Sequence, residues 1–368
     1  MSTASPVVTD LLSLLPADLR TVLREHFAGR GQPGYRAAQV ERWLFEAHAC
    51  SIREMTDLPE SERTGLADAF SVREPECARL QESVDGTVKH LWRLDSGGLV
   101  ESVLIPSGKR LTLCISSQSG CALACKFCAT GWGGFDAQLN AGEIVAQYRA
   151  SARWAEETGR GGITNVVYMG MGEPLANSNS VMSSLTILNA GYGVGARRIT
   201  VSTVGMVPGI LELARRPEQF GLALSLHAPH SDLRRELIPL EKRYPIGEVM
   251  QALREFRKTK GRRITFEYTM IRGVNDELSL VPALAGLSAE VGAFVNLIPF
   301  NPIPYNDWRP SSHRHIAGFA RELRARGVTV AVRESRGRDI DAACGQLRAH
   351  ALSREAEDEG SAGGIRPH

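Results

Sequence analysis

Apolar and polar positions in the first part of the chain repeat with the spacing of amphipathic helices. One such run extends over 16–27, with Pro16 at the helix start, and a second run covers 37–47. A third helix is predicted after Pro59. We therefore expect a helical accessory domain over residues 1–75.

The pattern changes to short runs between residues 76 and 108. Turn signals separate these runs, namely Asp85-Gly86 and Ser96-Gly97-Gly98. Short runs divided by such turns are typical of strands joined by tight connections. We interpret residues 76–108 as a β-rich segment that connects the helices to the rest of the chain.

Beyond residue 109, apolar strands alternate with amphipathic helices. Strands are predicted near 110–116, 163–170, 198–204, 221–227, 263–270, 294–299 and 328–333. Asn140, followed by Glu143, has the form of a capping box and predicts a helix start. Repeated βα units indicate an α/β domain over 109–350, a full or partial barrel whose functional groups lie where strands end. The polar, Gly-rich residues 351–368 are predicted to be disordered.

The composition is ordinary for a globular protein, with 368 residues, 43% of them hydrophobic, and a formal net charge of +2. This charge is too small to indicate a nucleic-acid partner by itself. The chain has neither a signal-peptide pattern nor a long uncharged apolar run, so we expect a cytoplasmic location without membrane contact. In a reducing compartment its seven cysteines suit ligand or catalytic roles, although Cys50 and Cys77 stand apart and are expected to be inert.

Three cysteines, Cys121, Cys125 and Cys128, lie within eight residues in a predicted loop after a strand. Electron-transfer clusters usually have four cysteine ligands. Three thiolates instead leave one iron of a 4Fe-4S cluster free to bind a further ligand. The alternative is a structural zinc site, which needs a fourth cysteine or histidine. Cys114 could supply it, but this residue lies on the preceding predicted strand.

The motif CxxxCxxC, with Phe127 before its last cysteine, resembles the signature of the radical S-adenosylmethionine (SAM) superfamily. The wider sequence resembles the RlmN type of radical SAM RNA adenine methyltransferases and their Cfr-type relatives. The matching segments are Glu101–Pro106, Leu113–Gln118, Met169–Leu175, Arg198–Thr203, Ser225–Pro229, Val295–Pro299 and Asp339–Leu347. The resemblance implies a radical SAM partial (β/α)6 TIM-like barrel. It also implies a 4Fe-4S cluster on Cys121, Cys125 and Cys128, with SAM bound beside it.

The resemblance places the SAM site at the ends of several strands. Its predicted contacts are Gly172, Glu173, Ser202, Ser225, Leu226, His227 and Asn301. Of these, Gly172 and Glu173 are implied to contact the SAM amino group. The local pattern alone leaves other interpretations open, because 170–174 could be a plain tight turn and His227 a histidine buried in the core.

Methylation at C2 of adenine needs an unusual route, because this carbon is electron-poor and its hydrogen is not acidic. A radical carrying the incoming carbon could add there, provided that a nucleophilic thiolate first stored a methyl group. The resemblance assigns this storage to Cys344, with one SAM as methyl donor and a second SAM cleaved to a radical that removes hydrogen from the S-methyl group. It assigns product release, by disulfide formation, to Cys114 and proton acceptance from C2 to Glu101. Locally, Cys114 could equally be a small buried apolar residue, Cys344 part of a helix cap, and Glu101 a solvated carboxylate.

The implied substrate is an adenine in the peptidyl-transferase centre of 23S rRNA, and an adenine next to the anticodon of tRNA is left open as a second one. The competing function is Cfr-type methylation at C8 of the same rRNA adenine, which confers antibiotic resistance. Met55–Pro59 resembles the C2 branch, whereas Tyr192–Ala196 and Arg243–Ile246 resemble the C8 branch at least as well. We favour C2. A non-catalytic electron carrier or RNA-binding scaffold would need neither Cys344 nor a three-ligand cluster.

The sequence offers candidate RNA contacts but does not single out any of them. Basic residues cluster in Arg254–Arg263 and at Arg321, Arg324 and Arg326, although such runs are more often solvated helix faces. The helical accessory domain resembles the RNA-binding module of the family. The resemblance further implies an electron donor such as flavodoxin, and we expect the enzyme to be a monomer.

Overall fold

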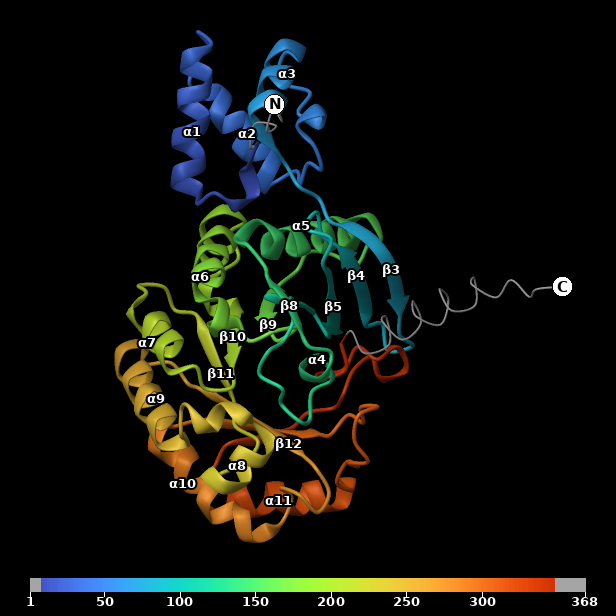
Figure 1. The fold of residues 1–368 in the computed structure, drawn as a ribbon, viewed down its shortest axis with the longest axis vertical. Helices are drawn as coiled ribbons and strands as arrows, with labels where there is room; N and C mark the ends of the chain where they lie inside the picture. The colour runs from blue at the N-terminus through green and yellow to red at the C-terminus, as the bar shows by residue number, and fades with distance from the viewer. Residues whose placement is uncertain (1–7, 348–368) are drawn as a thin grey trace, which may run out of the picture.

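The computed structural model describes residues 8–347, so the tail predicted over 351–368 lies outside the described residues. The chain forms a small group of helices at one end of a larger α/β body (Figure 1). The three predicted N-terminal helices are confirmed as α1 (Pro16–Gly29), α2 (Tyr35–Phe45) and α3 (Glu60–Ala69). Helix α2 ends at Phe45 rather than at residue 47, and the chain reaches a left-handed conformation, which does not continue a helix, at His48 (φ 52°).

These helices have a core of their own. Leu19, Leu23, Phe27 and Leu44 are fully buried and pack together, as their helical spacing predicts. At the base of the group, the two-residue strands β1 (Thr9–Asp10) and β2 (Phe70–Ser71) pair in parallel. The helical group therefore has its own core, to which Ala146 of the α/β body also contributes, and its ends lie together where the chain enters that body.

The α/β body is built on parallel strands at all the positions predicted from the sequence. They are β6 (Arg110–Cys114), β9 (Asn165–Tyr168), β10 (Ile199–Thr203), β11 (Gly221–Ser225), β12 (Thr265–Met270), β13 (Phe294–Pro299) and β14 (Val330–Val332). Each pairs in parallel with the next in this order. Within residues 8–347 no pairing joins β14 back to β6, so the barrel is open. This confirms the predicted partial (β/α)6 barrel, with one strand following the sixth unit.

The β-rich segment is part of the same sheet. Its strands β3 (Glu76–Glu82), β4 (Val88–Arg93) and β5 (Leu99–Ser107) continue the sheet from β6 by antiparallel pairing. The sheet consequently has ten strands, with β3 at one edge and β14 at the other. The predicted connecting segment thus extends the barrel wall.

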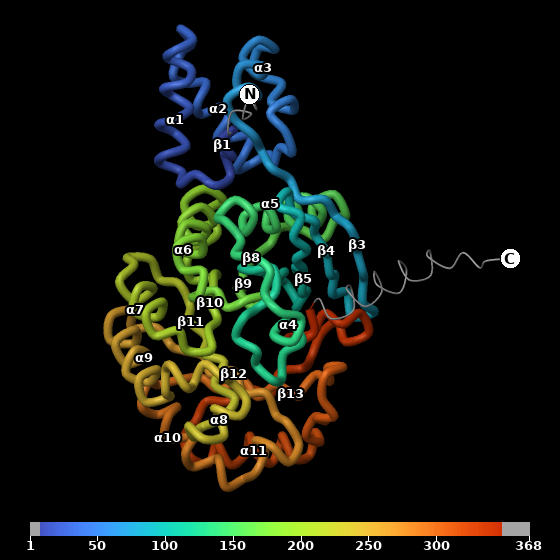
Figure 2. The backbone as a smooth tube through the Cα atoms, viewed as in Figure 1, coloured from blue at the N-terminus to red at the C-terminus, as the bar shows by residue number. Residues whose placement is uncertain are grey.

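Helices cover the outside of the curved sheet, as the tube trace shows (Figure 2). They are α5 (Ala141–Glu157), α6 (Ser178–Thr186), α7 (Val207–Arg215), α9 (Ile246–Lys260), α10 (Val281–Val291) and α11 (His313–Ala325). Helix α8 (Ser231–Leu237) instead packs beside Cys125, and its Leu237 carbonyl accepts the Lys126 amide at 3.0 Å. The predicted capping box of α5 is confirmed: the Asn140 side chain accepts the Glu143 amide at 2.9 Å, and the Glu143 carboxylate accepts the Asn140 amide at 2.9 Å. None of the helices in residues 8–347 is long and apolar enough to cross a membrane.

A small hairpin departs from the regular βα alternation. Strands β7 (Gln118–Gly120) and β8 (Phe135–Gln138) pair antiparallel, and the short helix α4 (Ala129–Trp132) lies between them. The sequence analysis did not predict this hairpin. It carries the cysteine motif out from the end of β6 and returns the chain to the start of α5.

Candidate active site

An open cavity of about 1050 Å³ lies at the carboxyl ends of the parallel strands. All residues predicted to bind the cluster or SAM line this cavity, except Leu226. Those that line it are Cys121, Cys125, Cys128, Gly172, Glu173, Ser202, Ser225, His227 and Asn301. The structure therefore brings together side chains from segments far apart in the sequence, at the end of the barrel where such enzymes hold their sites.

The β7–β8 hairpin shapes the loop of the three cysteines. The Cys121 amide donates to the Gly134 carbonyl at 2.7 Å, and the Cys128 amide donates to the Cys125 carbonyl at 3.1 Å. Ala124, between the first two cysteines, has a left-handed backbone (φ 51°) that turns the loop sharply. The loop is thus held by its own backbone and presents all three cysteines to one cavity.

Burial disfavours the ionised form of these thiols. Together with the neighbouring Cys128, it raises the pKa of Cys121 to about 12. Burial also raises the pKa of Cys125, to which both other cysteines contribute. A cationic group bound among them would lower these pKa values, because a thiol that coordinates a metal is deprotonated outright.

The arrangement differs from a site for a single ion. Within residues 8–347, no three His, Cys, Asp or Glu side chains converge as the ligands of one metal ion would. Cys114, the candidate fourth zinc ligand, lies outside the lining of this cavity. Separated thiols facing one space match a multi-iron cluster, whose ligands bind different corners.

The turn after β9 needs glycine. At Gly172 φ is 95°, and a Cβ there would lie 2.5 Å from the Gln118 side chain. The same Gln118 accepts the Glu173 amide at 2.7 Å. The Glu173 carboxylate accepts amides from Leu175 (3.1 Å) and Val204 (2.9 Å), while burial raises its pKa to about 7. Glu173 therefore faces the cavity as a fixed acceptor for a cationic group.

His227 is neutral and oriented. Its Nδ1 accepts the Thr269 amide at 3.0 Å, which leaves the ring proton on Nε2. Burial, reinforced by Arg234, lowers its pKa to about 3. Its ring lies 4.2 Å from the ring of Phe127 in the cysteine loop. Leu226, by contrast, is fully buried behind the cavity wall, so its side chain cannot contact a ligand there.

Asn301 connects the cavity to the segment that carries Cys344. Its Nδ2 donates to the Cys344 carbonyl at 3.2 Å, whereas its buried Oδ1 has no hydrogen-bond partner among residues 8–347. The next residue, Gly345, accepts the Ala129 amide at 2.6 Å. This segment is therefore tied across the cavity to the cysteine loop, and Asn301 leaves one acceptor free for a ligand.

A second cavity of about 370 Å³ adjoins the first, and Cys114 and Cys344 both line it. Cys344 is exposed and lines both cavities, while Cys114 is buried at the end of β6. Burial raises the pKa of Cys114 to about 12. Cys344 is accessible from the cavities but enclosed by protein on its other sides, and this partial loss of solvent raises its pKa. Arg333 lowers the pKa of both thiols and so favours their thiolate forms. The two cysteines paired by the sequence analysis thus meet beside one cation.

Glu101 lies apart from these cavities. It is buried on β5 and forms an ion pair with Lys89 at 3.1 Å. The Lys89 ammonium also donates to the Asp341 carbonyl at 3.3 Å, in the segment leading to Cys344. Glu101 lines neither cavity, so its link to the site runs through Lys89.

The sequence analysis missed three polar residues of the site, Gln118, Glu267 and Arg333. Glu267 lines the main cavity, accepts from Asn296 at 3.0 Å through Oε1, and has no hydrogen-bond partner for Oε2 among residues 8–347. Arg333 follows β14, and its amide donates to the Leu297 carbonyl at 2.8 Å. For Glu267 and Arg333, the available signal in the sequence was a charged residue within or just after an apolar strand.

Comparisons with known proteins agree with this geometry. The model of the radical SAM superfamily matches residues 115–278. The model of the ribosomal RNA large subunit methyltransferase N-terminal domain matches residues 12–72. A probable dual-specificity RNA methyltransferase RlmN of Gemmatimonas aurantiaca is 49% identical over 360 residues, 96% of this chain and 98% of the relative. The dual-specificity RNA methyltransferase RlmN of Alcanivorax borkumensis is 41% identical over 348 residues, 92% of this chain and 91% of that one.

The fold has a near match among solved structures. A radical SAM methyltransferase from Sphaerobacter thermophilus superposes with a TM-score of 0.88 at 46% identity, over 93% of this chain and 99% of that one. The similarity spans both the helical unit and the barrel. These matches agree with the cysteine loop and the two adjoining cavities of this chain. They place the chain in the RlmN family of radical SAM RNA methyltransferases.

Proposed function

We propose that this chain methylates C2 of an adenine in the peptidyl-transferase centre of 23S rRNA, and also C2 of an adenine next to the anticodon of tRNA. The second substrate is proposed because the relatives are named dual-specificity RNA methyltransferases. The observation that carries the proposal is the position of Cys344, which lines both the cavity of the cluster cysteines and the cavity of Cys114. A carrier of a methyl group must face both a donor and a releasing thiol.

The superfamily's cofactors, a 4Fe-4S cluster and SAM, fit the main cavity. We propose Cys121, Cys125 and Cys128 as the cluster ligands. The Glu173 carboxylate and the free Asn301 Oδ1 then supply acceptors to SAM, and the Cβ-free backbone at Gly172 leaves room for it. When bound, the cluster supplies an electron, and SAM supplies the methyl group and the fragment that removes hydrogen from it.

The chain's own residues would then hold and release the methyl carbon. Cys344 binds this carbon as a thioether, and Arg333 beside it favours the thiolate that accepts it. Once the carbon has joined adenine, the adduct must lose its C2 proton and one electron, which the oxidised cluster would take back. The Cys114 thiolate then attacks the Cys344 sulfur. The electron pair of the sulfur–carbon bond passes to the carbon, which takes up a proton and becomes the methyl group. The two sulfurs form a disulfide, which an external dithiol must reduce before the next cycle.

Glu101 remains our candidate for the base that accepts the C2 proton. It forms an ion pair with Lys89, and Lys89 also holds the segment before Cys344, which ties Glu101 to that segment. Because Glu101 lines neither cavity, this role requires the substrate to approach β5 through the second cavity. The assignment therefore predicts contact between RNA and the β5 side of that cavity.

The remaining assignments complete the proposal. We propose domains over 1–75, 76–108 and 109–350, with the first as an RNA-binding accessory domain and the second continuing the barrel sheet. The enzyme would work in the cytoplasm as a monomer, with an electron donor such as flavodoxin. The serine side chains of Ser202 and Ser225, which line the main cavity, would lie along the nucleoside part of SAM.

Mass spectrometry of nucleosides tests the proposal. Reduced holoenzyme with SAM should convert adenosine to 2-methyladenosine in 23S rRNA and in tRNA. Formation of 8-methyladenosine instead would assign a Cfr-type activity to the chain. The absence of any methyladenosine would contradict the proposed function.

Two variants test the cysteine roles. Cys344→Ala should keep its iron but give no methyladenosine. Cys114→Ala should stall with an RNA adduct on Cys344 that survives denaturation, and the double variant should lack it. Normal turnover by Cys114→Ala would show that the releasing thiol is misassigned.

A further inference from the structure

Two exposed aromatic rings stack on one another beside the cavity. Trp132 ends α4, directly after the cysteine loop, and Tyr305 belongs to the segment between β13 and α11. Their ring centroids are 5.6 Å apart and their planes differ by 13°. Trp132 is 49% exposed and Tyr305 is 43% exposed. An outward-facing stack of this kind contributes little to a core, so its exposed faces need another explanation.

The pair is fixed to the rim of the main cavity. The Lys126 carbonyl, within the cysteine loop, accepts the Trp132 Nε1 proton at 3.2 Å and the Asn306 side-chain amide at 2.9 Å. Gly131, next to Trp132, lines the cavity, and so does Asn301 on the segment that leads to Tyr305. Both rings are therefore held at the mouth by the loop that carries the cluster cysteines.

Three cationic residues belong to the segments that carry this aromatic pair or to a segment joined to them. Lys126, Arg272 and Arg309 are exposed, and the Arg272 amide donates to the Arg309 carbonyl at 2.9 Å, which joins their two segments. Among the described residues none of these three cations forms a salt bridge. Asp307 is the acidic residue of the same loop. Unpaired cations beside stacked rings suit a chain that carries both phosphates and bases.

We propose that the Trp132–Tyr305 pair stacks unpaired bases of the substrate RNA that flank the target adenine. This inference rests on the proposed function and names a contact for it. An adenine that enters the cavity must leave its stack, so its neighbours lose a stacking partner at the rim. An aromatic surface there replaces that partner for any base, because every base has a π face. Lys126, Arg272 and Arg309 would hold the phosphates between these bases.

Binding of RNA to the reduced-cluster holoenzyme tests the inference. The probe is a fluorescein-labelled 23S rRNA fragment spanning the peptidyl-transferase loop, followed by anisotropy. Trp132→Ala/Tyr305→Ala should weaken binding by about tenfold or more, as expected when a base loses its aromatic partner. Trp132→Phe and Tyr305→Phe should largely restore it. The matched control is Leu80→Ala, which removes an exposed apolar side chain from the edge strand β3. Iron content and SAM binding should equal wild type in every variant.

A second RNA isolates the stacking contact. In this probe the nucleotides flanking the target adenine are abasic, so it should bind wild type about tenfold more weakly, while the double alanine variant should weaken it no further. Equal weakening of both RNAs by the double variant would overturn the inference. So would unchanged RNA binding combined with slower cluster reduction by flavodoxin, because the surface would then serve a protein donor.

The outcomes also separate this inference from the proposed function. A wild-type enzyme that methylates RNA, with a double variant that binds RNA normally, contradicts the stacking contact alone. A wild-type enzyme that methylates no RNA contradicts the proposed function and the stacking contact with it.

Discussion

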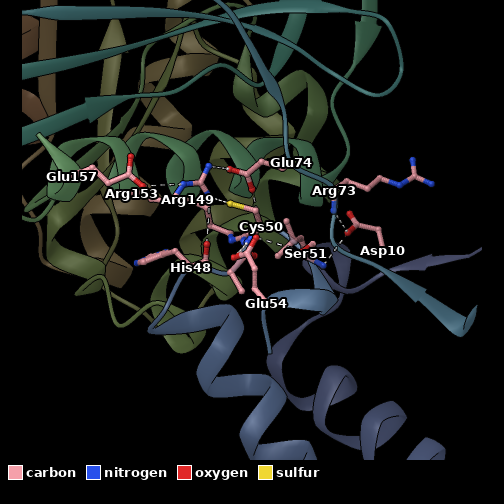
Figure 3. A network of polar contacts seen from close by, with 12 residues as sticks. Asp10, His48, Cys50, Ser51, Glu54, Arg73, Glu74, Arg149, Arg153 and Glu157 are labelled. Atoms are coloured by element: carbon pink, nitrogen blue, oxygen red, sulfur yellow. Dashed lines mark hydrogen bonds and ion pairs between the residues drawn. The ribbon is translucent and has the colours of Figure 1, made fainter. Parts of the chain in front are cut away.

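The mouth of the barrel and the junction between the helical unit and α5 both bury polar side chains, but they satisfy them differently. At the junction, Arg149 is fully buried on α5, and Glu74 lies between it and Arg153 with oxygens 3.4 Å and 2.7 Å away (Figure 3). Arg149 also donates to the Ala49 carbonyl, and Arg153 contacts the Cys50 sulfur. Here opposite charges meet inside the protein.

At the mouth, charged groups are not paired with one another. Glu267 and Arg333 both line the main cavity, yet within residues 8–347 neither forms a salt bridge. Asn301 Oδ1 and Glu267 Oε2 are buried and have no hydrogen-bond partner there. Burying such groups costs free energy unless something binds them. Arg149 and Glu74 at the junction also have buried atoms without a hydrogen-bond partner among residues 8–347. The two regions therefore differ in charge pairing: the junction pairs its charges and so joins the helical unit to α5, whereas the mouth leaves the charges of Glu267 and Arg333 without a salt bridge.

The largest effect should come from the mouth. Cys125→Ala should remove the iron and all methyl transfer, because two thiolates are too few to hold the cluster, while the circular dichroism of the fold persists. Iron analysis after anaerobic reconstitution and nucleoside mass spectrometry measure this. Cys77→Ala, which changes an exposed cysteine, should retain both iron and activity. Stoichiometric zinc without iron in the wild-type protein would contradict the cluster assignment.

The junction should respond in stability instead. Arg149→Met removes the fully buried partner of the partly buried Glu74 and should cost ~3 kcal/mol in the free energy of unfolding, near the lower end of what loss of one partner of a buried ion pair costs. Denaturant titration of the apo protein measures it. Arg153→Met, at a partly exposed position, should cost ~1 kcal/mol or less. Equal effects of the two variants would show that burial does not set the difference.

His90 belongs to neither region, and its substitution should change stability least. It is a fully buried side chain without a hydrogen-bond partner for either ring nitrogen among residues 8–347. It lies between Trp92 and Trp154, and burial lowers its pKa from 6.5 to about 4. Between these pH values the unfolded chain binds the proton and the folded chain does not, so stability falls as the pH falls. The loss reaches at most about 3 kcal/mol near pH 4.

His90→Phe removes this acid-dependent loss and keeps a ring between the two tryptophans. Its unfolding free energy should therefore drop less steeply than that of wild type from pH 6.5 to 4, as thermal or denaturant unfolding at several pH values can measure. Parallel profiles for the two proteins would show that His90 is protonated in the folded state.

Much of the fold was predictable because local pattern and burial agree. Strands of a parallel sheet are covered on both faces, so β11 reads as a largely apolar run, and α7, the helix before it, shows one apolar face. The cysteine motif was equally readable, since its ligands are close in sequence. For the second cavity, sequence resemblance paired Cys114 with Cys344, which the structure brings together.

What the sequence did not indicate depends on contacts between distant segments. Arg149 lies in an ordinary amphipathic pattern, and only its packing against Glu74 shows that it is fully buried. Trp132 and Tyr305 each look like a single exposed aromatic residue until the hairpin places one against the other. Leu226 was predicted to contact SAM because it belongs to a matching motif; its side chain is fully buried in the core, so the predicted contact would have to come from its backbone.

The hydrogen bond from Ala129 to the Gly345 carbonyl has a consequence for biosynthesis. It joins the loop of the cluster cysteines to a segment that is synthesised much later, and chains leave the ribosome N-terminal end first. A nascent chain that has emerged only as far as β13 already holds Cys121, Cys125 and Cys128. It still lacks Cys344 and the carbonyl that secures the loop, so the residues proposed to hold the cluster are synthesised well before the residue proposed to carry the methyl group.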